Sequence, residues 1–227
     1  MKIGVLLSGC GVYDGAEIQE AVFALLAIEE VGAEAVCISV NKDQHHVVNH
    51  LTGEEMNESR NMLVEAGRIA RGKVADISTI TPADIDALVI PGGFGSAKNF
   101  TKWAFAGPEG EILPEVKLLL VNLVNVGRPI AALCVSPVVV AKAFEGSTVK
   151  PFMTIGSSAA PSPYNIEGFA AGLLATGAKT SMKTNAEINI DRENKIVTAP
   201  CYMMETDLIT LRNNIKDSVG ALVELMG

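Results

Sequence analysis

The sequence lacks both an excess of basic charge and a long uninterrupted apolar run. It has 18 Lys and Arg against 26 Asp and Glu, a formal net charge of −8 at pH 7. Its apolar stretches are broken by a charge, proline or glycine well before the roughly 20 residues that a bilayer requires. An acidic chain is poorly suited to a phosphate backbone or an anionic membrane. We therefore expect no nucleic acid and no membrane as partner, and a small molecule or a protein instead.

The sequence is also poor in cysteine and histidine. No pair of cysteines has the C-x-x-C spacing, which argues against zinc ribbons and thioredoxin chemistry. Met1 and Lys2 lead at once into strand-like residues, with no room for a signal peptide. We therefore expect a cytoplasmic protein whose cysteines are free thiols, without a resident metal or cofactor. The four cysteines are Cys10, Cys37, Cys134 and Cys201.

No linker, repeat or low-complexity tract divides the 227 residues, so we expect one domain over residues 1–227. Strand-like and helix-like segments alternate along most of the chain. Because the strands are apolar on both faces, they indicate a mostly parallel, doubly wound sheet in a three-layer α/β/α sandwich. The expected strands are 2–8, 33–40, 86–90 and 129–133, the expected helices are 17–31, 59–70, 113–126 and 205–225, and a small β-hairpin is expected over 186–200.

In such a sheet, ligands bind outside the carboxyl ends of the strands. Three loops should meet at that edge: "SGCGVYDGAEIQE" from residue 8, "PGGFGSAKN" from residue 91 and "CVSP" from residue 134. Their side chains and backbone groups are the candidates for a functional site.

The first loop allows two interpretations. Its glycines resemble a dinucleotide fingerprint, in which backbone N–H groups hold a pyrophosphate. However, Asp14 and Glu17 have the spacing of a capping box, which would place carboxylates where a phosphate should lie. Glu20 then remains, directly before the apolar "AVFALLAI", where burial would raise its pKa and keep it a proton donor. The alternative is an exposed glutamate on the first turns of a helix.

"RPIAALCVSPVVVAKAF" predicts a strand, a sharp turn and a helix, with Ser136 as N-cap and Pro137 at the first helical position. Cys134 would lie at the helix's positive end, in the arrangement of a nucleophile elbow, and its chemistry requires a lowered pKa. The alternative is an inert buried cysteine. The "PGGFG" turn could supply oxyanion donors from its backbone, with the N–H that follows the cysteine, or could be a plain turn.

Taken together, "SGCGVYDGAEIQEAV", "NHLTGE", "RNMLVEAGRIARG", "DALVIPGGFGSAKN", "CVSP" and "NKIVTAPCYM" resemble the PfpI and class I glutamine amidotransferase-like superfamily, with its flavodoxin-like fold, and most closely its ElbB-type, glyoxalase-like branch. The resemblance implies that Cys134 is the nucleophile, that Glu20 hydrogen-bonds it, and that Gly92, Gly93 and Val135 form the oxyanion or substrate-binding backbone. It implies conversion of small 2-oxoaldehydes, such as methylglyoxal and glyoxal, to hydroxy acids without glutathione. It also implies a homodimer.

The sequence departs from the superfamily in its histidines. Glutaminases of this fold use a histidine downstream of the cysteine, whereas His45, His46 and His50 all lie upstream. Amide hydrolysis by a Cys-His-Glu triad is therefore not expected. If the segment were helical, His46 and His50 would share a face, but no third metal ligand is evident. His50, Asp14, Asn99 and Cys10 are possible neighbours of the pocket, with Cys10 as a possible resolving thiol.

Three hypotheses follow. The first is a glyoxalase-like lyase in which Cys134 forms a hemithioacetal and Glu20 shuttles a proton. The second is a cysteine redox sensor or a non-catalytic binding protein. The third is an amidotransferase-like subunit linked to isoprenoid biosynthesis, as family naming sometimes suggests.

Overall fold

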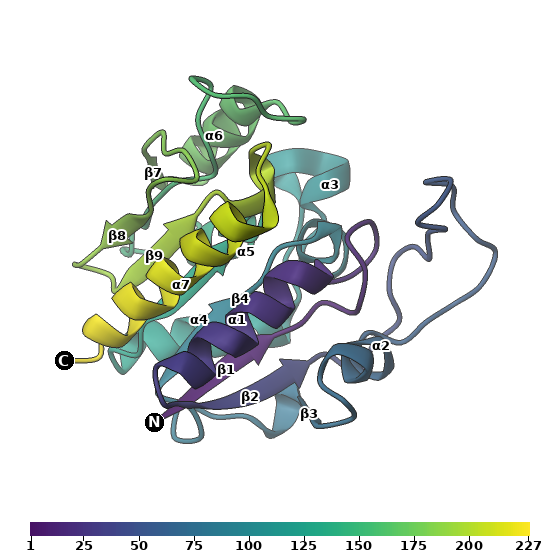
Figure 1. The fold of residues 1–227 in the computed structure, drawn as a ribbon, viewed down its shortest axis with the longest axis horizontal. Helices are drawn as coiled ribbons and strands as arrows, with labels where there is room; N and C mark the ends of the chain where they lie inside the picture. The colour runs from purple at the N-terminus through teal and green to yellow at the C-terminus, as the bar shows by residue number, and fades with distance from the viewer.

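A computed structural model describes all residues 1–227 as a three-layer α/β/α sandwich (Figure 1). The seven-stranded sheet has the order β3-β2-β1-β4-β5-β9-β8, and only β8 is antiparallel to its neighbour. The fold expected from the alternating strands and helices is confirmed. The sheet strands are β1 (Lys2–Leu6), β2 (Glu34–Ser39), β3 (Val74–Asp76), β4 (Ala87–Ile90), β5 (Ile130–Leu133), β8 (Asn189–Asp191) and β9 (Ile196–Ala199).

Helices cover both faces of the sheet. On one face α1 packs against α7, with α2 beside α1, and on the other face α4 packs against α5 (Figure 1). Two further helices, α3 and α6, lie near the end of the sheet where the strands finish. The helices are α1 (Ile18–Glu30), α2 (Met62–Ile69), α3 (Trp103–Ala106), α4 (Pro114–Asn125), α5 (Pro137–Phe144), α6 (Ile166–Ala175) and α7 (Leu208–Glu224).

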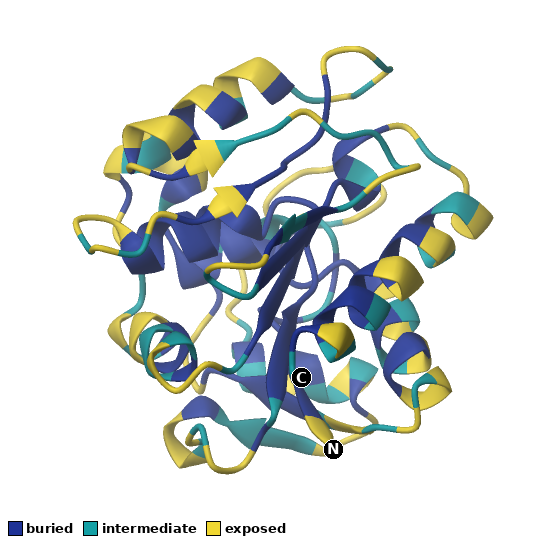
Figure 2. Cartoon of the chain, turned by 90° about the vertical axis from the view of Figure 1, so that its left-hand side faces the viewer, coloured by how far each residue is buried: buried dark blue, intermediate teal, exposed yellow.

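The central strands are buried on both faces because helices lie above and below them. All four residues of β4 and of β5 are buried, and Figure 2 shows the sheet as a buried layer between helices with exposed outer sides. One hydrophobic core joins the layers and includes Ile166 and Leu173 of α6. No helix is both long and apolar enough to cross a membrane.

The segment between α5 and β8 was not predicted from the sequence. It contains α6 and the small parallel pair β6 (Phe152–Met153) and β7 (Lys179–Thr180). Each of these strands has only two residues, which is too short for an alternating pattern to be recognised. This segment lies beside the carboxyl ends of β5 and β9 and contributes side chains to the site described below.

Short helical turns complete the connections. They are η1 (Ile77–Thr79), η2 (Ser96–Phe100), η3 (Gly107–Glu109) and η4 (Cys201–Met203). Of these, η2 follows the "PGGFG" turn after β4, and η4 follows β9 directly. Both therefore lie at the edge of the sheet where the strands end.

Candidate active site

Cys134 lies in a sharp turn between β5 and α5, as the sequence predicts. Its φ is +57°, in the left-handed region that non-glycine residues rarely occupy. Ser136 precedes Pro137 at the start of α5, but its hydroxyl does not cap the helix. Instead it donates to the Pro91 carbonyl at 2.6 Å and contacts the Ser96 hydroxyl at 2.8 Å. Ser136 is thus the N-cap residue of α5 and Pro137 its first residue, as predicted, but the Ser136 side chain ties the cysteine turn to the "PGGFG" turn instead of bonding the N–H groups of the helix.

Glu20 is fully buried on the first turn of α1, which excludes the alternative of an exposed glutamate. Its carboxyl group contacts the side chain of Cys134. Oε2 accepts a hydrogen bond from the backbone N–H of Gly92 at 2.8 Å, and Oε1 accepts one from the N–H of Tyr202 at 3.2 Å. The carboxyl group therefore joins α1 to the turns after β4 and β9, and faces the cysteine.

The protonation of this pair differs from the sequence-based expectation. Burial raises the pKa of Glu20 to about 8, and the neighbouring Glu17 acts in the same direction. Burial, followed by the charge of Glu20, raises the pKa of Cys134 well above its usual value, although the N–H of Gly93 opposes this. The expected lowering of the cysteine pKa is wrong. At neutral pH the site without substrate holds the Cys134 thiol and the protonated carboxyl group of Glu20. Removal of one proton from this pair gives either the Glu20 carboxylate, which is a base, or the Cys134 thiolate, which is a nucleophile.

Gly92 and Gly93 are glycines for different reasons. A Cβ on Gly92 would lie 2.5 Å from Glu20 Oε2 and 2.8 Å from Cys134 Sγ, so no side chain fits between them. Gly93 has φ +93°, and a Cβ there would collide with the backbone of Gly15. The N–H of Gly92 is engaged by Glu20, whereas the N–H of Gly93 faces Cys134. Of the two, Gly93 is therefore the better oxyanion donor.

The first loop packs against this turn and holds it in place. The N–H of Gly11 donates to Ala16 O at 2.8 Å, and the N–H of Gly15 donates to Gly11 O at 2.7 Å. The N–H of Glu17 donates to Gly92 O at 3.0 Å. These three N–H groups of the loop are thus used within the protein and are not free to bind a phosphate.

The expected capping box, with Asp14 as N-cap and Glu17 three residues later, is not formed, because α1 begins at Ile18. Glu17 is the N-cap of α1 and accepts from the N–H of Glu20 at 2.6 Å. Asp14 is not a cap, because the turn around Gly15 carries it away from the helix. Its Oδ2 accepts from the N–H of Val48 at 2.7 Å, so Asp14 anchors the loop that follows β2.

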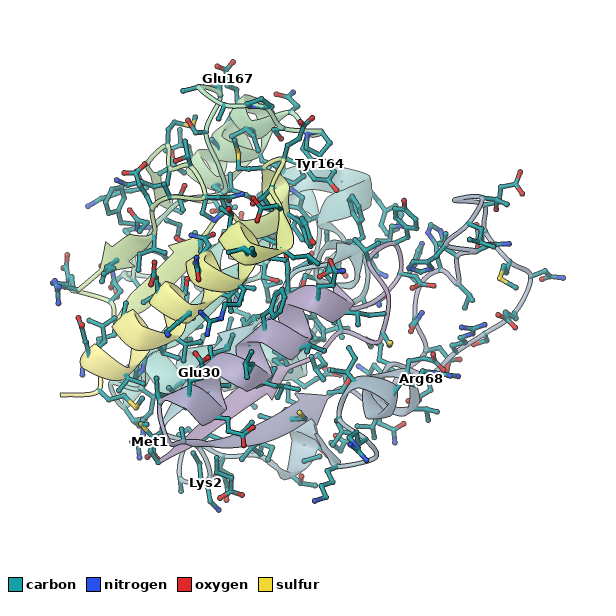
Figure 3. The ribbon with its side chains drawn as sticks, in the orientation of Figure 1. Met1, Lys2, Glu30, Arg68, Tyr164 and Glu167 are labelled. Atoms are coloured by element: carbon teal, nitrogen blue, oxygen red, sulfur yellow. The ribbon has the colours of Figure 1, made fainter.

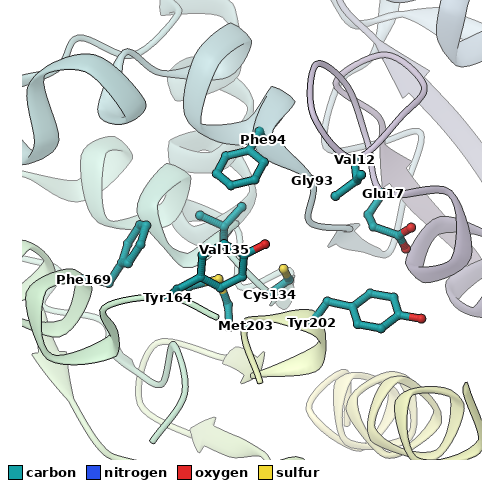
Figure 4. A pocket seen from close by; sticks show the side chains of 10 residues that line it. All are labelled: Val12, Glu17, Gly93, Phe94, Cys134, Val135, Tyr164, Phe169, Tyr202 and Met203. Atoms are coloured by element: carbon teal, nitrogen blue, oxygen red, sulfur yellow. The ribbon is translucent and has the colours of Figure 1, made fainter. Parts of the chain in front are cut away.

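A small pocket of about 320 Å³, including its mouth, opens over Cys134 (Figure 4). Gly93 and Val135 line it beside the cysteine, as the oxyanion hypothesis requires. Its remaining wall is mostly apolar and aromatic, which suits a small, weakly polar molecule. The lining residues are Val12, Glu17, Gly93, Phe94, Cys134, Val135, Tyr164, Phe169, Tyr202 and Met203.

The two tyrosines of the pocket were not predicted from the sequence. Tyr202 follows β9 in "APCYM", and its hydroxyl is hydrogen-bonded to Gln19 of α1. Tyr164 comes from the unpredicted segment just before α6 (Figure 3). Tyr164 belongs to no recognisable motif. Tyr202 lies in "NKIVTAPCYM", one of the stretches that carry the resemblance, but it was not singled out as a site residue. The fold brings both tyrosines to the pocket of Cys134.

Six of the site residues named from the sequence do not line the pocket: Glu20 and Gly92, which contact Cys134, and Asp14, Asn99, His50 and Cys10, which lie elsewhere. The Asn99 side chain donates to Ser8 O at 2.9 Å and Asp14 O at 2.8 Å, and accepts from the N–H of His45 at 2.9 Å. His50 Nε2 accepts from the N–H of Tyr13 at 3.2 Å. These side chains hold the surrounding loops together, and Asp14, described above, has the same role.

Cys10 is not placed as a resolving thiol for Cys134. It is half-buried in the first loop, and its charged neighbours are Glu65 and Arg68 of α2. The cysteine beside Cys134 is Cys201, which is fully buried at the end of β9. The two strands β5 and β9 are paired, which brings their following residues together.

The histidines do not form a helix face. Residues 41–61 run as an irregular loop with isolated bridges, Asp43 to Asn61 and Val48 to Glu55. The rings of His45 and His46 pack on each other and on Phe105. No group of three or more His, Cys, Asp or Glu side chains is arranged to hold a metal ion.

No family model matches the chain, but whole proteins do. The human "glutamine amidotransferase-like class 1 domain-containing protein 3, mitochondrial" is 38% identical over 230 residues, covering 100% of this chain and 84% of the relative. The rat "ES1 protein homolog, mitochondrial" is 38% identical over 98% of this chain and 82% of the relative. These names overturn the expected cytoplasmic location, since related proteins are mitochondrial. The expectation rested on the first few residues alone, which do not decide the compartment.

Solved structures agree with the fold. An isoprenoid biosynthesis protein with an amidotransferase-like domain from Ehrlichia chaffeensis superposes with a TM-score of 0.90 at 34% identity, over the whole of both chains. DJ-1beta of Drosophila melanogaster superposes with a TM-score of 0.53 at 18% identity, over 99% of this chain and 95% of that one, which shows a shared fold only. The chain therefore belongs to the glutamine amidotransferase-like class 1 domain family and has the fold of the ThiJ/PfpI and DJ-1 proteins.

Proposed function

We propose that this amidotransferase-like protein is a cysteine enzyme that acts on small 2-oxoaldehydes, of the glyoxalase-like type, and releases hydroxy acids without glutathione. The observation that carries the proposal is the contact between Cys134, which lines a small apolar pocket, and the carboxyl group of Glu20, which is fully buried. Such a pair supplies a nucleophile and a proton shuttle next to each other. No cofactor takes part, because the overall reaction is an internal rearrangement with addition of water.

The first step joins the substrate to the cysteine. The step begins from the form of the site in which Glu20 has lost its proton. Glu20 takes the proton of the Cys134 thiol while Sγ bonds to the aldehyde carbon and the carbonyl π bond breaks. The oxygen that becomes negative lies between the N–H groups of Gly93 and Val135, and then receives the proton from Glu20. The product is a hemithioacetal. Backbone donors of this kind typically accelerate such steps by about 10²- to 10³-fold each.

The later steps move hydrogen between the two carbons. Glu20 removes the hydrogen of the thiol-bearing carbon as a proton, and an enediolate forms with its negative charge on the oxygen of the adjacent carbon. Return of that proton to the adjacent carbon gives a thioester of a 2-hydroxy acid. Water then attacks the thioester, the bond to Sγ breaks, and the cysteine recovers its proton as the hydroxy acid leaves. Methylglyoxal gives lactate, and glyoxal gives glycolate.

The arrangement is less suited to amide hydrolysis. When an amide is cleaved, its nitrogen is a poor leaving group unless an acid protonates it. In the Cys-His-Glu triad a histidine supplies this proton. Here the three histidines belong to the loop after β2 and do not line the pocket. An aldehyde has no leaving group to expel, so this deficiency does not affect the proposed reaction.

A second candidate function is an amidotransferase-like subunit that supports isoprenoid biosynthesis. The similar proteins favour it over the glyoxalase-like reaction, because their names refer to an amidotransferase-like domain and to isoprenoid biosynthesis and do not mention glyoxalase activity. Ammonia release from glutamine by the purified protein, lost in Cys134→Ala, would support this candidate. No ammonia in the presence of active lactate formation would exclude a glutaminase role.

The deciding experiment measures lactate formed from methylglyoxal without glutathione. We expect turnover by the native protein, loss of at least about 10³-fold in Cys134→Ala because the nucleophile is absent, and a similar loss in Glu20→Gln. Cys37→Ala is the matched control, since Cys37 is also a buried cysteine but lies in β2 and does not line the pocket. Equal activity of Cys134→Ala and the native protein would rule the reaction out. A homodimer is also proposed, and sedimentation would test it.

A further inference from the structure

Tyr164 places an unengaged hydroxyl group in the pocket above Cys134. The hydrogen bonds at Tyr164 use only its backbone, because its N–H donates to Ser162 Oγ at 3.0 Å and its carbonyl accepts from Ser162 and Ile166. Figure 4 shows the ring entering the pocket with its hydroxyl directed towards Gly93 and Cys134. The hydroxyl is therefore available to a bound molecule.

The other hydroxyl group that lines the pocket is already engaged. The Tyr202 hydroxyl is hydrogen-bonded to Gln19 and points out of the pocket towards α1 (Figure 4). The Glu20 carboxyl group accepts from two backbone N–H groups and contacts Cys134. Tyr164 is thus the side-chain donor of the pocket that has no partner within the protein.

The tyrosine is held firmly in this position. Ser162, which bonds the backbone of Tyr164, also donates to Met203 O at 2.6 Å and so ties the segment to η4. The ring of Phe94 meets the Tyr164 ring edge-on, with centroids 5.9 Å apart. Met203 and Phe94 themselves line the pocket. A donor fixed in this way loses little entropy when it binds a substrate atom.

We propose that the Tyr164 hydroxyl donates a hydrogen bond to the second carbonyl oxygen of a 2-oxoaldehyde held on Cys134, and that it thereby selects dicarbonyl compounds over simple aldehydes. This inference rests on the proposed function. The first oxygen of the substrate has donors in Gly93 and Val135. The adjacent oxygen needs a donor of its own, and the Tyr164 side chain lines the same pocket.

The role of Tyr164 is greatest in the proton transfer. When Glu20 takes the C1 hydrogen as a proton, the electrons of that bond form the C1–C2 double bond, and the C2 carbonyl π pair moves onto the C2 oxygen. Negative charge therefore develops where the Tyr164 hydroxyl donates. As Glu20 returns the proton to C2, the C1 hydroxyl becomes the thioester carbonyl and its proton passes to the C2 oxygen. Tyr164 keeps its own proton throughout.

The surroundings of the phenol agree with a donor that stays protonated. Burial, with the nearby Cys134 and Glu20, raises the pKa of Tyr164 to about 12. The hydroxyl consequently remains neutral over the whole pH range in which Glu20, with a pKa of about 8, changes its charge. A change of pH should therefore alter the base without altering this donor.

The test compares methylglyoxal with propanal, which has the same three carbons but lacks the second carbonyl oxygen. Two quantities are measured for the native protein and for Tyr164→Phe: kcat/KM for lactate formation, and the concentration of each aldehyde that protects Cys134 from iodoacetamide, read on the Cys134 peptide by mass spectrometry. Tyr13→Phe is the matched control. Its ring lies against His50, outside the pocket, so its loss removes a nearby hydroxyl without altering the lining.

We expect Tyr164→Phe to lower kcat/KM for methylglyoxal about 10- to 100-fold. We also expect Tyr164→Phe to need about tenfold more methylglyoxal to protect Cys134 from iodoacetamide, and an unchanged concentration of propanal. The preference of Cys134 for methylglyoxal over propanal would then fall about tenfold. Tyr13→Phe should change neither quantity.

The contrary results are distinct. If Tyr164→Phe weakened the protection of Cys134 by methylglyoxal and by propanal equally, Tyr164 would have a structural role and the proposed selection would be overturned. An unchanged preference for methylglyoxal would also overturn it. Absence of lactate from the native protein would overturn the proposed function and the proton-transfer role of Tyr164 with it. The protection ratio would still decide whether Tyr164 recognises the second oxygen.

Discussion

The backbone N–H of Gly92 donates a hydrogen bond of 2.8 Å to Oε2 of Glu20, across 72 residues of sequence. This bond orients the carboxyl group towards Cys134 and engages the N–H of Gly92, whereas the N–H of the next residue, Gly93, faces Cys134. For this bond to form, the backbone of Gly92 lies closer to the side chains of Glu20 and Cys134 than a residue with a Cβ atom could. The Glu20 carboxyl group is therefore held beside Cys134 by the backbone of a glycine.

Gly92→Ala should separate the reactive pair. The added Cβ would collide with Cys134 and with Glu20 Oε2, so we expect a loss of about 1 to 3 kcal/mol in the free energy of unfolding, and loss of activity. Chemical denaturation and the lactate assay measure the two effects. Gly220→Ala is the control, because nothing lies near that position in α7 and a helical alanine should add about 0.5 to 1 kcal/mol. Native activity in Gly92→Ala would show that the close contact is not required.

The stability of the protein should fall with rising pH because of Glu20. Its folded-state pKa is raised from 4.5 to about 8, so over that range the unfolded chain loses a proton that the folded protein retains. The contribution of Glu20 to stability is fully present below about pH 4.5 and is lost as the pH rises through about 8. Relative to Glu20→Gln, the native protein should lose up to about 1.4 kcal/mol per pH unit in this window.

Urea denaturation of both proteins at several pH values measures this difference. A constant difference between pH 5 and 8 would show that the pKa of Glu20 is not raised. The rate of lactate formation should rise over the same window and level off above about pH 8, because the proton shuttle needs the ionised carboxyl group to begin.

The cysteines should differ in their rates of alkylation. Cys10 is only half-buried, whereas Cys37, Cys134 and Cys201 are buried. We expect iodoacetamide at pH 7 to modify Cys10 first, and the rate at Cys134 to rise about tenfold per pH unit, because its pKa is raised and the thiolate is the reactive form. Peptide mass spectrometry measures each site. Selective oxidation of Cys134 by mild peroxide at pH 7 would contradict this and would favour the redox-sensor hypothesis.

Asn99→Ala should destabilise the loops rather than alter the chemistry. Asn99 is buried, and its side chain makes three hydrogen bonds to the backbone of the loops after β1 and β2. Their loss should cost about 2 to 3 kcal/mol in the free energy of unfolding. Asn213→Ala, on the exposed side of α7, should change it by less than about 0.5 kcal/mol. A loss of kcat in Asn99→Ala without a loss of stability would instead place Asn99 in the reaction.

The fold could be predicted because its signals are local. Buried parallel strands such as β4 and β5 are short apolar runs, and helices such as α1 and α4 have their own periodicity and end signals. The loop that contains His45 and His50 was less predictable. Its residues are held by isolated bridges and by contacts with distant side chains, which leave no periodic pattern.

The alternation of strands and helices over most of the chain could be inferred from the amino-acid sequence, and the resemblance to the superfamily implied the pairing of Cys134 with Glu20. Their protonation depends on the folded protein, because the pKa values are set by burial among elements far apart in the chain. The fold also selects the neighbours that complete the pocket. Tyr164 and Tyr202 come from separate segments and were not singled out from the sequence, whereas Cys10 and Asn99 contact other parts of the protein. Local patterns are set by neighbouring residues, but a site is set by how the layers pack.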